Sequence, residues 1–322
     1  MKALDINNLK KIYKTRIFRQ KIDALINVNI QVDSGSIVGL VGPNGSGKST
    51  IVKIILNLVK QTSGKVYIFG KDSNNKKARQ NIGYLPEVDK YPLYLSGMEL
   101  LKLCCSFNKK KIKNYNKNLN ELVDFFDLNK VINISMSKYS KGMRKKLGLI
   151  QALLFDPKLL ILDEPIEGLD AEGKKMLTDI LKIYSKKGIS VFINSHYLSE
   201  MEKLCDKIII IKKGITVEEY NYNNNNSKEG FVISYTYDNN NNKAFDISSF
   251  NNNKFPVTIV NNDSILIKTN EIIILNNFIN YLINQKYLIT AVKPVTKSIE
   301  DLYFSKGCNI KNLHYYLSPE SA

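Results

Sequence analysis

Three short and nearly uninterrupted apolar stretches mark the first two thirds of the chain, at residues 37–41, 159–162 and 189–193. Their length and their content of Ile, Val, Leu and Phe are typical of β-strands that are buried on both faces. Segments with the apolar spacing of a helix follow the first two stretches, at residues 50–59 and about 171–185. Strands that alternate with helices in this way predict an α/β fold with parallel strands.

A different pattern, in which apolar and polar residues alternate, occupies residues 4–32 on both sides of a basic segment. This alternation predicts an antiparallel β-layer. Further strands are predicted at residues 65–70 and 82–85, and a proline ends the second of them. Gly64 lies just before the first of these strands, and we expect it to be the C′ residue of the helix at 50–59.

Residues 88–150 show helical periodicity and are expected to form a helical subdomain. Ser96 and Glu99 have the spacing of a capping box, in which each side chain binds the other residue's backbone amide at the start of a helix. A second helix is predicted at about residues 119–126. A third begins after Ser140, which is its expected N-cap.

The C-terminal third differs from the rest because it is rich in asparagine. Residues 217–229 are expected to be a linker, and residues 230–322 a small α+β domain with short alternating strands and a helix at about 271–283. The asparagine runs at 239–242 and 251–253 are interpreted as loops, since asparagine tolerates left-handed turns; prion-like disorder is the alternative. We identify no residues in this region that predict chemistry.

The net charge of +17 comes from the first part of the chain. Residues 1–216 contain 38 lysines and arginines against 20 acidic residues, whereas residues 217–322 contain 9 against 10. A basic balance favours attraction to a polyanionic nucleotide, an anionic membrane surface or nucleic acid. Biased codon usage that enriches lysine and asparagine together is the alternative. Because the lysine run at 109–111 lacks interleaved aromatic residues, we do not expect nucleic-acid binding.

Length and residue usage narrow the class of protein further. A chain of 322 residues with 43% hydrophobic residues can bury a large core and is expected to form two domains. The sequence has no run of about 18 apolar residues, no apolar core of a signal peptide and no disulfide or metal-ligand spacing among its four cysteines. We therefore expect a soluble, intracellular protein. Only two histidines occur, which excludes a multi-histidine metal site.

The first apolar strand runs directly into residues 42–50, which fit the pattern G-x-x-x-x-G-K-[ST]. In this pattern backbone amides surround phosphate oxygens, the lysine binds the β- and γ-phosphates and the hydroxyl binds Mg²⁺. The flanking strand and helix place the phosphates at a helix N-terminus, where the helix dipole favours them. The nucleotide-contacting residues predicted here are Gly42, Pro43, Asn44, Gly45, Ser46, Gly47, Lys48, Ser49 and Thr50.

Two adjacent acidic residues, Asp163 and Glu164, follow the second apolar strand. A pair of carboxylates at the end of such a strand is costly to bury unless a cation or a substrate uses it. The first carboxylate can hold Mg²⁺, and the second can orient and polarise a water molecule for attack on a γ-phosphoryl group. His196 ends the third apolar strand, which we expect to be parallel to the second, so the histidine can reach the same phosphate.

Three further residues have more than one interpretation. Tyr13 precedes the second strand of the N-terminal layer, where its ring can stack on a nucleotide base or pack on the surface. Glu87 lies at the end of a strand, where α/β sheets place ligand contacts, or it is a solvated loop carboxylate. Ser140 is an N-cap whose neighbouring amides can bind an anion.

Taken in chain order, these motifs resemble those of the ATP-binding subunit of an ABC transporter over about residues 4–216. The resemblance implies a P-loop NTPase cassette with a mixed sheet core, an antiparallel β-layer and a helical subdomain. The matching elements are the adenine-stacking aromatic at Tyr13, the Walker A loop at 42–50, the Q-loop at Glu87, the signature motif at 139–143, the Walker B strand at 159–164, the D-loop at Asp170 and the switch histidine at His196.

Two of these motifs depart from the family pattern. Glu87 stands where the family has glutamine, so it can accept a hydrogen bond from Mg²⁺-bound water but cannot donate one when ionised. Lys141 and Met143 replace a glycine and the glutamine of the signature, whose serine and second glycine are kept. Lys141 either adds a cation beside the γ-phosphate or is solvated. These variants and the sequence SIEDLYF at 298–304 resemble the subgroup that serves ABC-2-type exporters.

The resemblance also implies a mechanism and partners. Two copies, expected to form a homodimer, sandwich two MgATP molecules, and their hydrolysis drives a separate integral-membrane permease. The protein is then cytoplasmic and peripheral on the inner face of the cell membrane. The implied roles are phosphate binding by Lys48, Mg²⁺ binding by Ser49, Asp163 and Glu87, water activation by Glu164 and γ-phosphate stabilisation by His196. Ser140 and Gly142 are implied to contact the nucleotide from the partner subunit, and Asp170 is an implied nucleotide-binding residue of the D-loop.

Two other functions are alternatives. One is a soluble ABC ATPase that acts on ribosomes or DNA, although such relatives usually carry two cassettes in one chain or a long coiled-coil insertion. The other is an ATP-sensing regulatory module with weak hydrolysis. The presence of Glu164 and His196 opposes this second alternative, while Glu87 leaves room for it.

Overall fold

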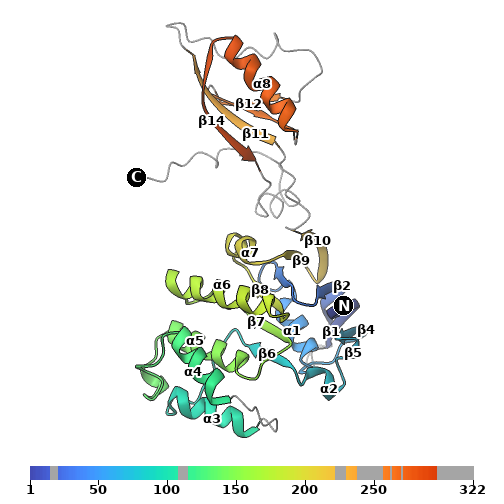
Figure 1. Ribbon diagram of the computed structural model, residues 1–322. Coiled ribbons are helices and arrows are strands. Elements are labelled where there is room, and N and C mark those ends of the chain that lie inside the picture. Colours follow the sequence, from blue (N-terminus) through green and yellow to red (C-terminus); the bar gives the residue numbers. More distant parts are fainter. Residues whose placement is uncertain are drawn as a thin grey trace. The chain divides into compact units, whose positions relative to one another are not determined.

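The chain folds into two compact units, Met1–Tyr222 and Asn223–Ala322. Each unit has its own hydrophobic core, and Figure 1 labels the elements. The sequence segment 298–304 and the asparagine runs of the second unit lie outside the described residues. The structure is a computed structural model that describes residues 1–14, 21–107, 115–221, 230–237, 257–261, 263–269 and 271–295.

The alternating N-terminal pattern forms the predicted antiparallel layer. Strand β1 (Lys2–Lys14) pairs antiparallel with β2 (Lys21–Asp33) on one side and with β4 (Ser63–Ile68) on the other. The short strand β5 (Lys71–Asp72) extends the layer beyond β4. Apolar residues of β1 such as Leu4 are fully buried, because every second side chain of the strand faces the core.

The three apolar stretches form the parallel core of the sheet, as predicted. Strands β9 (Lys207–Lys212), β3 (Ile37–Val41), β8 (Ser190–Ser195), β7 (Leu159–Asp163) and β6 (Ile82–Leu85) lie side by side in this order, and each neighbouring pair is parallel. Parallel strands share one carboxyl edge. The motifs that follow β3, β6, β7 and β8 in the sequence therefore meet at the same edge of the sheet.

Strand β10 (Ile215–Asn221) joins the parallel core to the antiparallel layer. It pairs antiparallel with β9 and, through one parallel bridge between Ile215 and Asn27, with β2. The result is a ten-stranded sheet in the order β5-β4-β1-β2-β10-β9-β3-β8-β7-β6. Residues 217–221 were expected to be linker, but they belong to this strand. Their side chains are at most half-buried, so the hydrophobic signal of the strand is weak.

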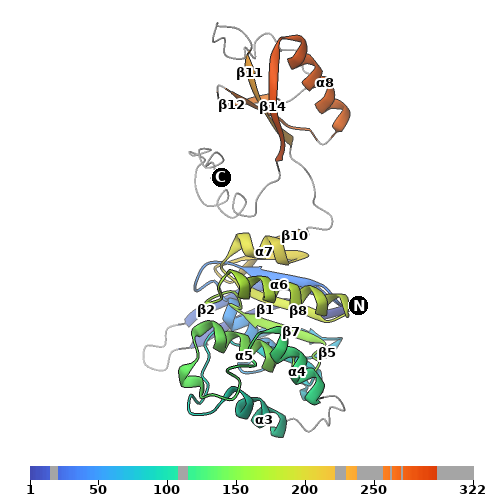
Figure 2. The same ribbon diagram turned by 60° about the vertical axis from the view of Figure 1, so that its left-hand side comes forward.

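Helices pack on both faces of the parallel strands (Figures 1 and 2). Helix α1 (Lys48–Ile55) lies between the antiparallel layer and the parallel core, because its buried residues share one hydrophobic cluster with both. Helices α6 (Ala171–Lys186) and α7 (Leu198–Leu204) cover the other face. The short helix α2 (Lys76–Arg79) follows β5, and the Asn75 side chain caps it.

The helix after the glycine-rich loop is shorter than its hydrophobic spacing predicts. Helix α1 ends at Ile55, and Asn57 has a left-handed φ of 57°. The prediction that Gly64 is the C′ residue of this helix is wrong, because Gly64 lies in β4 with φ 88°. A Cβ at Gly64 would lie 2.4 Å from the carbonyl oxygen of Asn8. Glycine is needed there because β1 passes so closely.

The helical subdomain contains α3 (Gly97–Phe107), α4 (Tyr115–Phe125) and α5 (Lys141–Leu153). The predicted capping box at the start of α3 is confirmed. The Ser96 amide donates to Oε2 of Glu99 at 2.8 Å, and the Glu99 amide donates to Oγ of Ser96 at 3.2 Å. Two of the four free amides of this helix end are thereby satisfied.

A 3-10 turn, η1 (Met136–Lys138), leads into α5. The predicted N-cap of α5 is also confirmed, since Oγ of Ser140 accepts a hydrogen bond from the Met143 amide at 3.1 Å. The preceding Tyr139 is buried, and its hydroxyl donates to the carbonyl oxygen of Val131 at 2.7 Å. These contacts fix the direction in which α5 leaves the turn.

The second unit is the expected small α+β structure. Its sheet is antiparallel, in the order β12 (Val257–Asn261), β13 (Ser264–Ile267), β11 (Gly230–Tyr237) and β14 (Tyr287–Val295). Helix α8 (Ile272–Asn284) packs on this sheet through its buried apolar face. In the described parts of both units, every helix is too short or too polar to cross a membrane.

Candidate active site

The loop between β3 and α1 needs glycine at several positions. Gly45 and Gly47 have φ values of 78° and 111°, in the left-handed region. A Cβ at Gly47 would lie 2.5 Å from the Leu25 side chain, and one at Gly42 would lie 2.3 Å from the carbonyl oxygen of Ile211. Glycine therefore lets the loop pack against β2 and β9 while it turns into α1.

The start of α1 is suited to binding an anion. Its N-cap residue is Gly47, which has no side chain to cap the helix, and no acidic residue lies in the first turn. The Ser46 hydroxyl is buried and has no hydrogen-bond partner among the described residues. Unpaired donors at a helix start fit a phosphate group, which accepts several hydrogen bonds and is favoured by the helix dipole.

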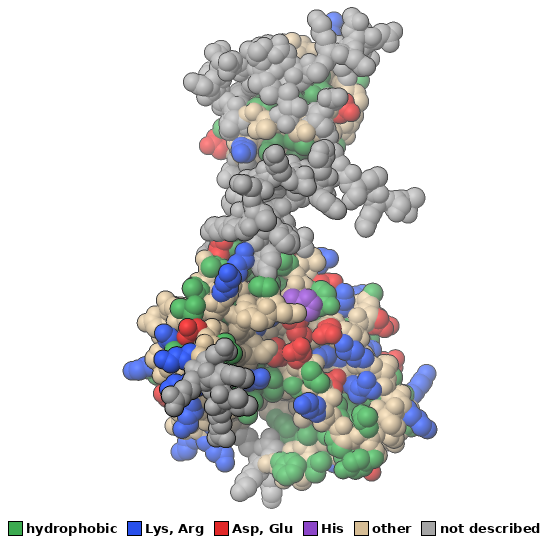
Figure 3. Space-filling view, turned by 180° about the vertical axis from the view of Figure 1, so that it is seen from behind, with side chains coloured by type: hydrophobic (Ala, Val, Ile, Leu, Met, Phe, Trp, Pro, Cys, Tyr) green, Lys and Arg blue, Asp and Glu red, His purple; other side chains and the backbone are tan. Residues whose placement is uncertain are grey.

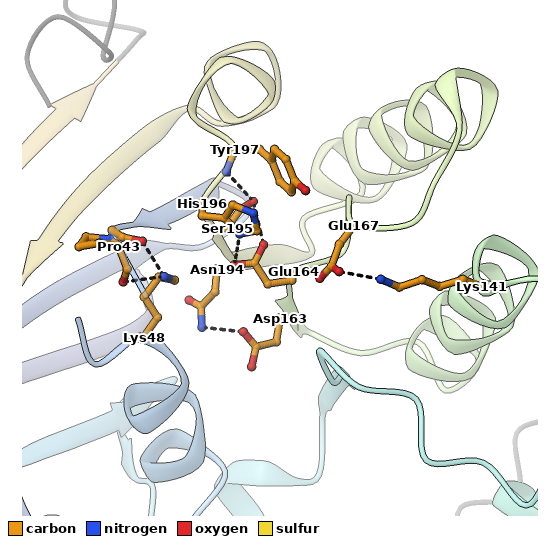
Figure 4. Close-up of polar contacts among 11 residues, drawn as sticks. Pro43, Lys48, Lys141, Asp163, Glu164, Glu167, Asn194, Ser195, His196 and Tyr197 are labelled. Carbon is orange, nitrogen blue, oxygen red and sulfur yellow. Dashed lines mark hydrogen bonds and ion pairs between the residues drawn. The ribbon is translucent and has the colours of Figure 1, made fainter. Parts of the chain in front are cut away.

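Lys48 is the first residue of α1, and its side chain turns back over the loop (Figure 4). Its Nζ donates to the carbonyl oxygens of Gly42 at 2.6 Å and Pro43 at 3.2 Å. Burial lowers the pKa of the Lys48 ammonium, whereas the carboxylates of Glu164 and Asp163 oppose this shift. A buried cation held beside the loop matches the predicted role of Lys48 toward phosphate.

Asp163 is the last residue of β7 and is 5% exposed. Its Oδ1 accepts a hydrogen bond from the Asn194 side-chain amide at 3.3 Å (Figure 4). Burial raises the pKa of Asp163, and the hydrogen bond from Asn194 acts in the opposite direction. The register of the parallel strands explains the contact, because Asp163 of β7 lies directly opposite Asn194 of β8.

Glu164 follows Asp163 with a left-handed φ of 47°, and its amide donates to the carbonyl oxygen of Asn194 at 2.9 Å. Both carboxylate oxygens have partners from the end of β8. Oε2 accepts from the Ser195 hydroxyl at 3.2 Å, and Oε1 lies 2.9 Å from Nδ1 of His196 (Figure 4). The Glu164 side chain is 7% exposed, while the His196 side chain is 41% exposed. Glu164 is therefore held rigidly, and His196 reaches toward solvent.

Glu87 lies on the loop after β6 and is exposed. Burial is the main influence on the pKa of Asp163 and of Lys48, but the charge of Glu87 acts on both, so its carboxylate faces the same edge of the sheet. Burial first, and then Asp163 and Glu87, raise the pKa of Tyr84 to about 12. Figure 3 shows this face of the molecule, where a histidine lies beside acidic side chains with lysines and arginines around them.

The donor set at this edge fits Mg²⁺. In proteins Mg²⁺ is usually bound through one or two carboxylates together with substrate phosphates and water. Asp163 and Glu87 supply carboxylates whose charges interact, and Ser49 lies in the first turn of α1. In the described parts of the chain, no group of three or more His, Cys, Asp or Glu side chains is arranged to hold a metal ion. These few protein ligands agree with a site in which phosphate oxygens supply the remaining ligands of the ion.

Three predicted nucleotide-contacting residues lie on elements other than the phosphate loop, where each contacts neighbouring residues of the protein. Tyr13 lies on β1, with Nζ of Lys11 4.8 Å from its ring centroid. Ser140 caps α5, as described above. Asp170 is the N-cap of α6, where its Oδ1 accepts from the Gly173 amide at 2.7 Å. Their roles toward the nucleotide stay predictions.

Lys141 is exposed to solvent and pairs with an acidic side chain. Its Nζ lies 2.6 Å from Oε1 of Glu167 (Figure 4), and its stem covers Gly168, where a Cβ would lie 2.8 Å from the Lys141 Cδ. Gly142 packs on the same segment, since a Cβ there would lie 3.1 Å from the carbonyl oxygen of Gly168. The start of α5 therefore contacts the segment that follows the Asp163–Glu164 pair.

Sequence reasoning missed the residues that support the carboxylates. Asn194 and Ser195 were identified only as the end of a strand, yet both are fully buried and bind Asp163 and Glu164. The available signal was two polar residues at the end of an otherwise apolar strand. Glu167, the partner of Lys141, gave no such signal because it is one of several acids in a loop.

This arrangement defines a P-loop nucleotide-binding protein, with a phosphate loop at the carboxyl edge of a parallel sheet and two carboxylates beside it. Comparisons with known proteins give the family. The sequence profile described as ABC transporter matches residues 25–167. The ABC transporter ATP-binding protein YhcH of Bacillus subtilis is 34% identical over 304 residues, which are 92% of this chain and 93% of its own. The chain therefore belongs to the ATP-binding proteins of ABC transporters, and its first unit is an ABC-type ATPase domain, as predicted.

Two further relatives show how far the similarity extends. The ATP-binding protein all4389 of Nostoc is 36% identical over 211 residues, which are 65% of this chain and 63% of its own. The lantibiotic transport ATP-binding protein SrtF of Streptococcus pyogenes is 35% identical over 228 residues, which are 70% of this chain and 94% of its own. The chain thus spans less than two thirds of the length of the Nostoc relative and nearly all of SrtF.

Solved structures confirm the predicted ABC cassette fold. An ATP-binding subunit of an ABC transporter aligns with a TM-score of 0.63 at 28% identity, over 69% of this chain and 91% of its own. The dimeric bacterial ABC transporter cassette MJ0796 aligns with a TM-score of 0.62 at 26% identity, over 68% of this chain and 98% of its own. Its post-hydrolysis state with ADP and Pi aligns with a TM-score of 0.61, also at 26% identity and over the same shares of both chains.

Proposed function

We propose that this chain binds and hydrolyses MgATP as one subunit of a dimer, and thereby drives export through a separate integral-membrane permease. The observation that carries this proposal is the convergence at one sheet edge of an uncapped P-loop helix, buried Lys48, and the Asp163–Glu164 pair with His196 against Glu164. The transport named for SrtF and the dimer named for MJ0796 support the transporter and dimer parts.

Phosphate binding rests on the loop and on Lys48. The amides at the start of α1 and the free Ser46 hydroxyl supply donors for the β- and γ-phosphates of ATP. Lys48 exchanges its two carbonyl contacts for phosphate oxygens, which are stronger acceptors because they are charged. Ser49, Asp163 and Glu87 hold Mg²⁺, which neutralises charge on the β- and γ-phosphate oxygens when it is bound.

Hydrolysis rests on Glu164. Its carboxylate accepts a hydrogen bond and then a proton from the water that attacks the γ-phosphorus, while the bond to the ADP oxygen breaks. Its backbone is fixed by the Asn194 carbonyl, and its oxygens are fixed by Ser195 and His196. His196 is exposed enough for Nε2 to contact the γ-phosphate, and this nitrogen donates when both ring nitrogens carry a proton. This rigid orientation removes reorganisation cost at the moment of reaction.

The dimer and the permease complete the proposal. Ser140 and Gly142 lie at the start of α5, and we assign them to the nucleotide of the partner subunit. Large apolar side chains stand exposed near Glu87 and on α3, where Figure 3 shows hydrophobic side chains gathered at one end of the first unit. They suit a permease segment on the inner membrane face. These side chains are Val88, Leu93, Tyr94, Leu103 and Phe107.

The direct test compares the wild type with Glu164→Gln. We expect kcat for ATP hydrolysis to fall by about 10²–10⁴-fold, the range for loss of a general base. ATP binding should persist, and ATP should hold the variant as a dimer in light scattering. Glu172→Gln is the matched control, since Glu172 is an exposed acid in the first turn of α6. Undiminished hydrolysis by Glu164→Gln would remove Glu164 from the role of base.

A further inference from the structure

A lysine of α5 is buried although the mechanism above does not use it. The Lys145 side chain is 1% exposed and is among the largest fully buried side chains of the chain. Burial lowers the pKa of this ammonium, which expresses the cost of removing a charge from water. Such a residue is kept only where nearby groups compensate the charge.

The groups that compensate the charge lie mainly on the Glu87 loop, and Glu167 and Asp163 add further negative charge. Nζ of Lys145 donates to the backbone carbonyl oxygen of Glu87 at 3.2 Å. Asp89 of the same loop is the main source of negative charge near Lys145. Asp89 is itself half-buried, with a buried Oδ1 that has no hydrogen-bond partner among the described residues. Lys145 thus meets one backbone dipole and one carboxylate of the loop.

The rest of α5 confirms that the two elements are in close contact. Gly148 lies one turn after Lys145 and so on the same face of the helix. A Cβ at Gly148 would lie 2.6 Å from the Leu85 side chain and 2.7 Å from the Tyr91 hydroxyl. The chain from Leu85 to Tyr91 therefore runs directly over this face, and glycine allows the close approach.

From these contacts we infer that Lys145 is a positioning residue, which ties the Glu87 loop to the helix that begins at Ser140. The hydrogen bond from Lys145 to the Glu87 carbonyl places the Glu87 carboxylate at the Mg²⁺ site. The inference therefore rests on the proposed function. The same helix presents Ser140 at its start. Loop and signature serine are therefore parts of one rigid body.

Stability alone does not require this lysine. A methionine has a similar length and would fill the same space without a desolvated charge. It would leave the half-buried Asp89 without the positive charge that most strongly offsets its burial, so the test needs both changes. In Lys145→Met/Asp89→Asn the packing is kept and both charges of the pair are removed together, so comparison with Asp89→Asn reports the loss of the lysine and of its hydrogen bond to the Glu87 carbonyl.

The test compares this double variant with Asp89→Asn alone, with Lys145→Arg, and with Lys146→Met as a neighbouring control. We expect the double variant to lose about tenfold in kcat with little change in KM for ATP, since a misplaced group penalises the reaction rather than binding. The Mg²⁺ concentration for half-maximal activity should rise several-fold. Lys145→Arg should keep most of the wild-type kcat, and the kcat of Lys146→Met should match that of the wild type.

A second readout does not depend on hydrolysis. Amide hydrogen exchange of residues 86–91 should be faster in the double variant than in Asp89→Asn. Equal exchange, or an unchanged kcat and Mg²⁺ requirement, would overturn the inference. If the wild type itself did not hydrolyse ATP, the proposed function would fail, and the exchange rates would still decide whether Lys145 holds the loop.

Discussion

At the scale of single residues, the site depends on side chains that touch no predicted substrate atom. Ser195 illustrates this, because its hydroxyl donates to Glu164 at 3.2 Å and accepts from the Tyr197 amide at 3.2 Å. The serine is fully buried, so water cannot replace either contact easily. One orientation of the Glu164 carboxylate is selected before any nucleotide arrives.

We predict that Ser195→Ala lowers kcat about 5- to 20-fold with KM for ATP unchanged, since one orienting hydrogen bond of the base is lost. Ser190→Ala is the matched control. Ser190 is equally buried on the same strand, but its Oγ accepts from the Gly35 amide at the far end of β8. Steady-state phosphate release measures both variants. Equal kcat losses in the two variants would show a general effect of destabilising β8.

At the scale of elements, close backbone approaches decide where glycine is needed. Gly64 lies in β4 and Gly70 follows it, and the two have similar left-handed φ values of 88° and 74°. Their surroundings differ, because a Cβ at Gly64 would meet the backbone of β1, whereas at Gly70 nothing lies within 4 Å. The strain of a left-handed backbone angle is the same for alanine at both positions, so the effects of the two substitutions differ only through packing.

The pair makes a direct prediction. Gly70→Ala should lower the free energy of unfolding by about 1–2 kcal/mol, the cost of a left-handed residue with a Cβ. Gly64→Ala should cost at least about 1 kcal/mol more, because the backbone of Asn8 must move. Urea unfolding of the two variants measures the difference. Equal losses would mean that β1 shifts at no cost.

The capping box of α3 predicts a pH dependence. The Ser96 amide and hydroxyl hold the pKa of Glu99 below its ordinary value of 4.5. A folded-state pKa below the unfolded one stabilises the fold above pH 4.5, and this contribution is lost as the pH falls through the folded-state pKa. The wild type should therefore melt at a higher temperature than Glu99→Gln at pH 7, and the gap should close near pH 3.

Glu121→Gln on α4 is the control for the capping box. Glu121 pairs only loosely with Lys117, at 3.8 Å with both side chains mostly exposed, and such pairs contribute little. Its melting temperature should follow the wild type at both pH values. A gap for Glu99→Gln that persists at pH 3 would contradict the assignment to the ionised carboxylate.

At the scale of the whole molecule, the chain consists of two units with separate cores. The boundary matters because β10 completes the sheet of the first unit. Glu218, Glu219 and Tyr220 pair with Ile210, Ile209 and Ile208 of β9. Without β10, the apolar strand β9 becomes an unpaired edge, which favours aggregation.

We predict that a chain of residues 1–222 folds and binds ATP like the full chain, with a melting temperature within about 3 °C of the corresponding transition. A chain of residues 1–216 should melt lower and aggregate. Calorimetry and light scattering at equal concentration compare the two. Equal behaviour of both truncations would show that β10 contributes nothing to the first unit.

The elements β9, β10 and α7 were not identified in the sequence, whereas the other main strands and helices of the first unit, the phosphate loop and the two carboxylates were. These features depend on local patterns: apolar runs, glycine spacing and a few motifs read along one strand–loop–helix segment at a time. The capping residues Ser96 and Ser140 were predictable for the same reason, because their partners lie three residues away.

Only the tertiary structure decided which residues meet across elements. The register of β7 and β8 brings Asn194 and Ser195 to the carboxylates, and the close packing of α5 on the Glu87 loop buries Lys145. The same holds for Gly64, whose need for glycine comes from β1, and for β10, whose partner β9 defines it as a strand. Such contacts join residues far apart in the sequence, so local sequence patterns do not predict them.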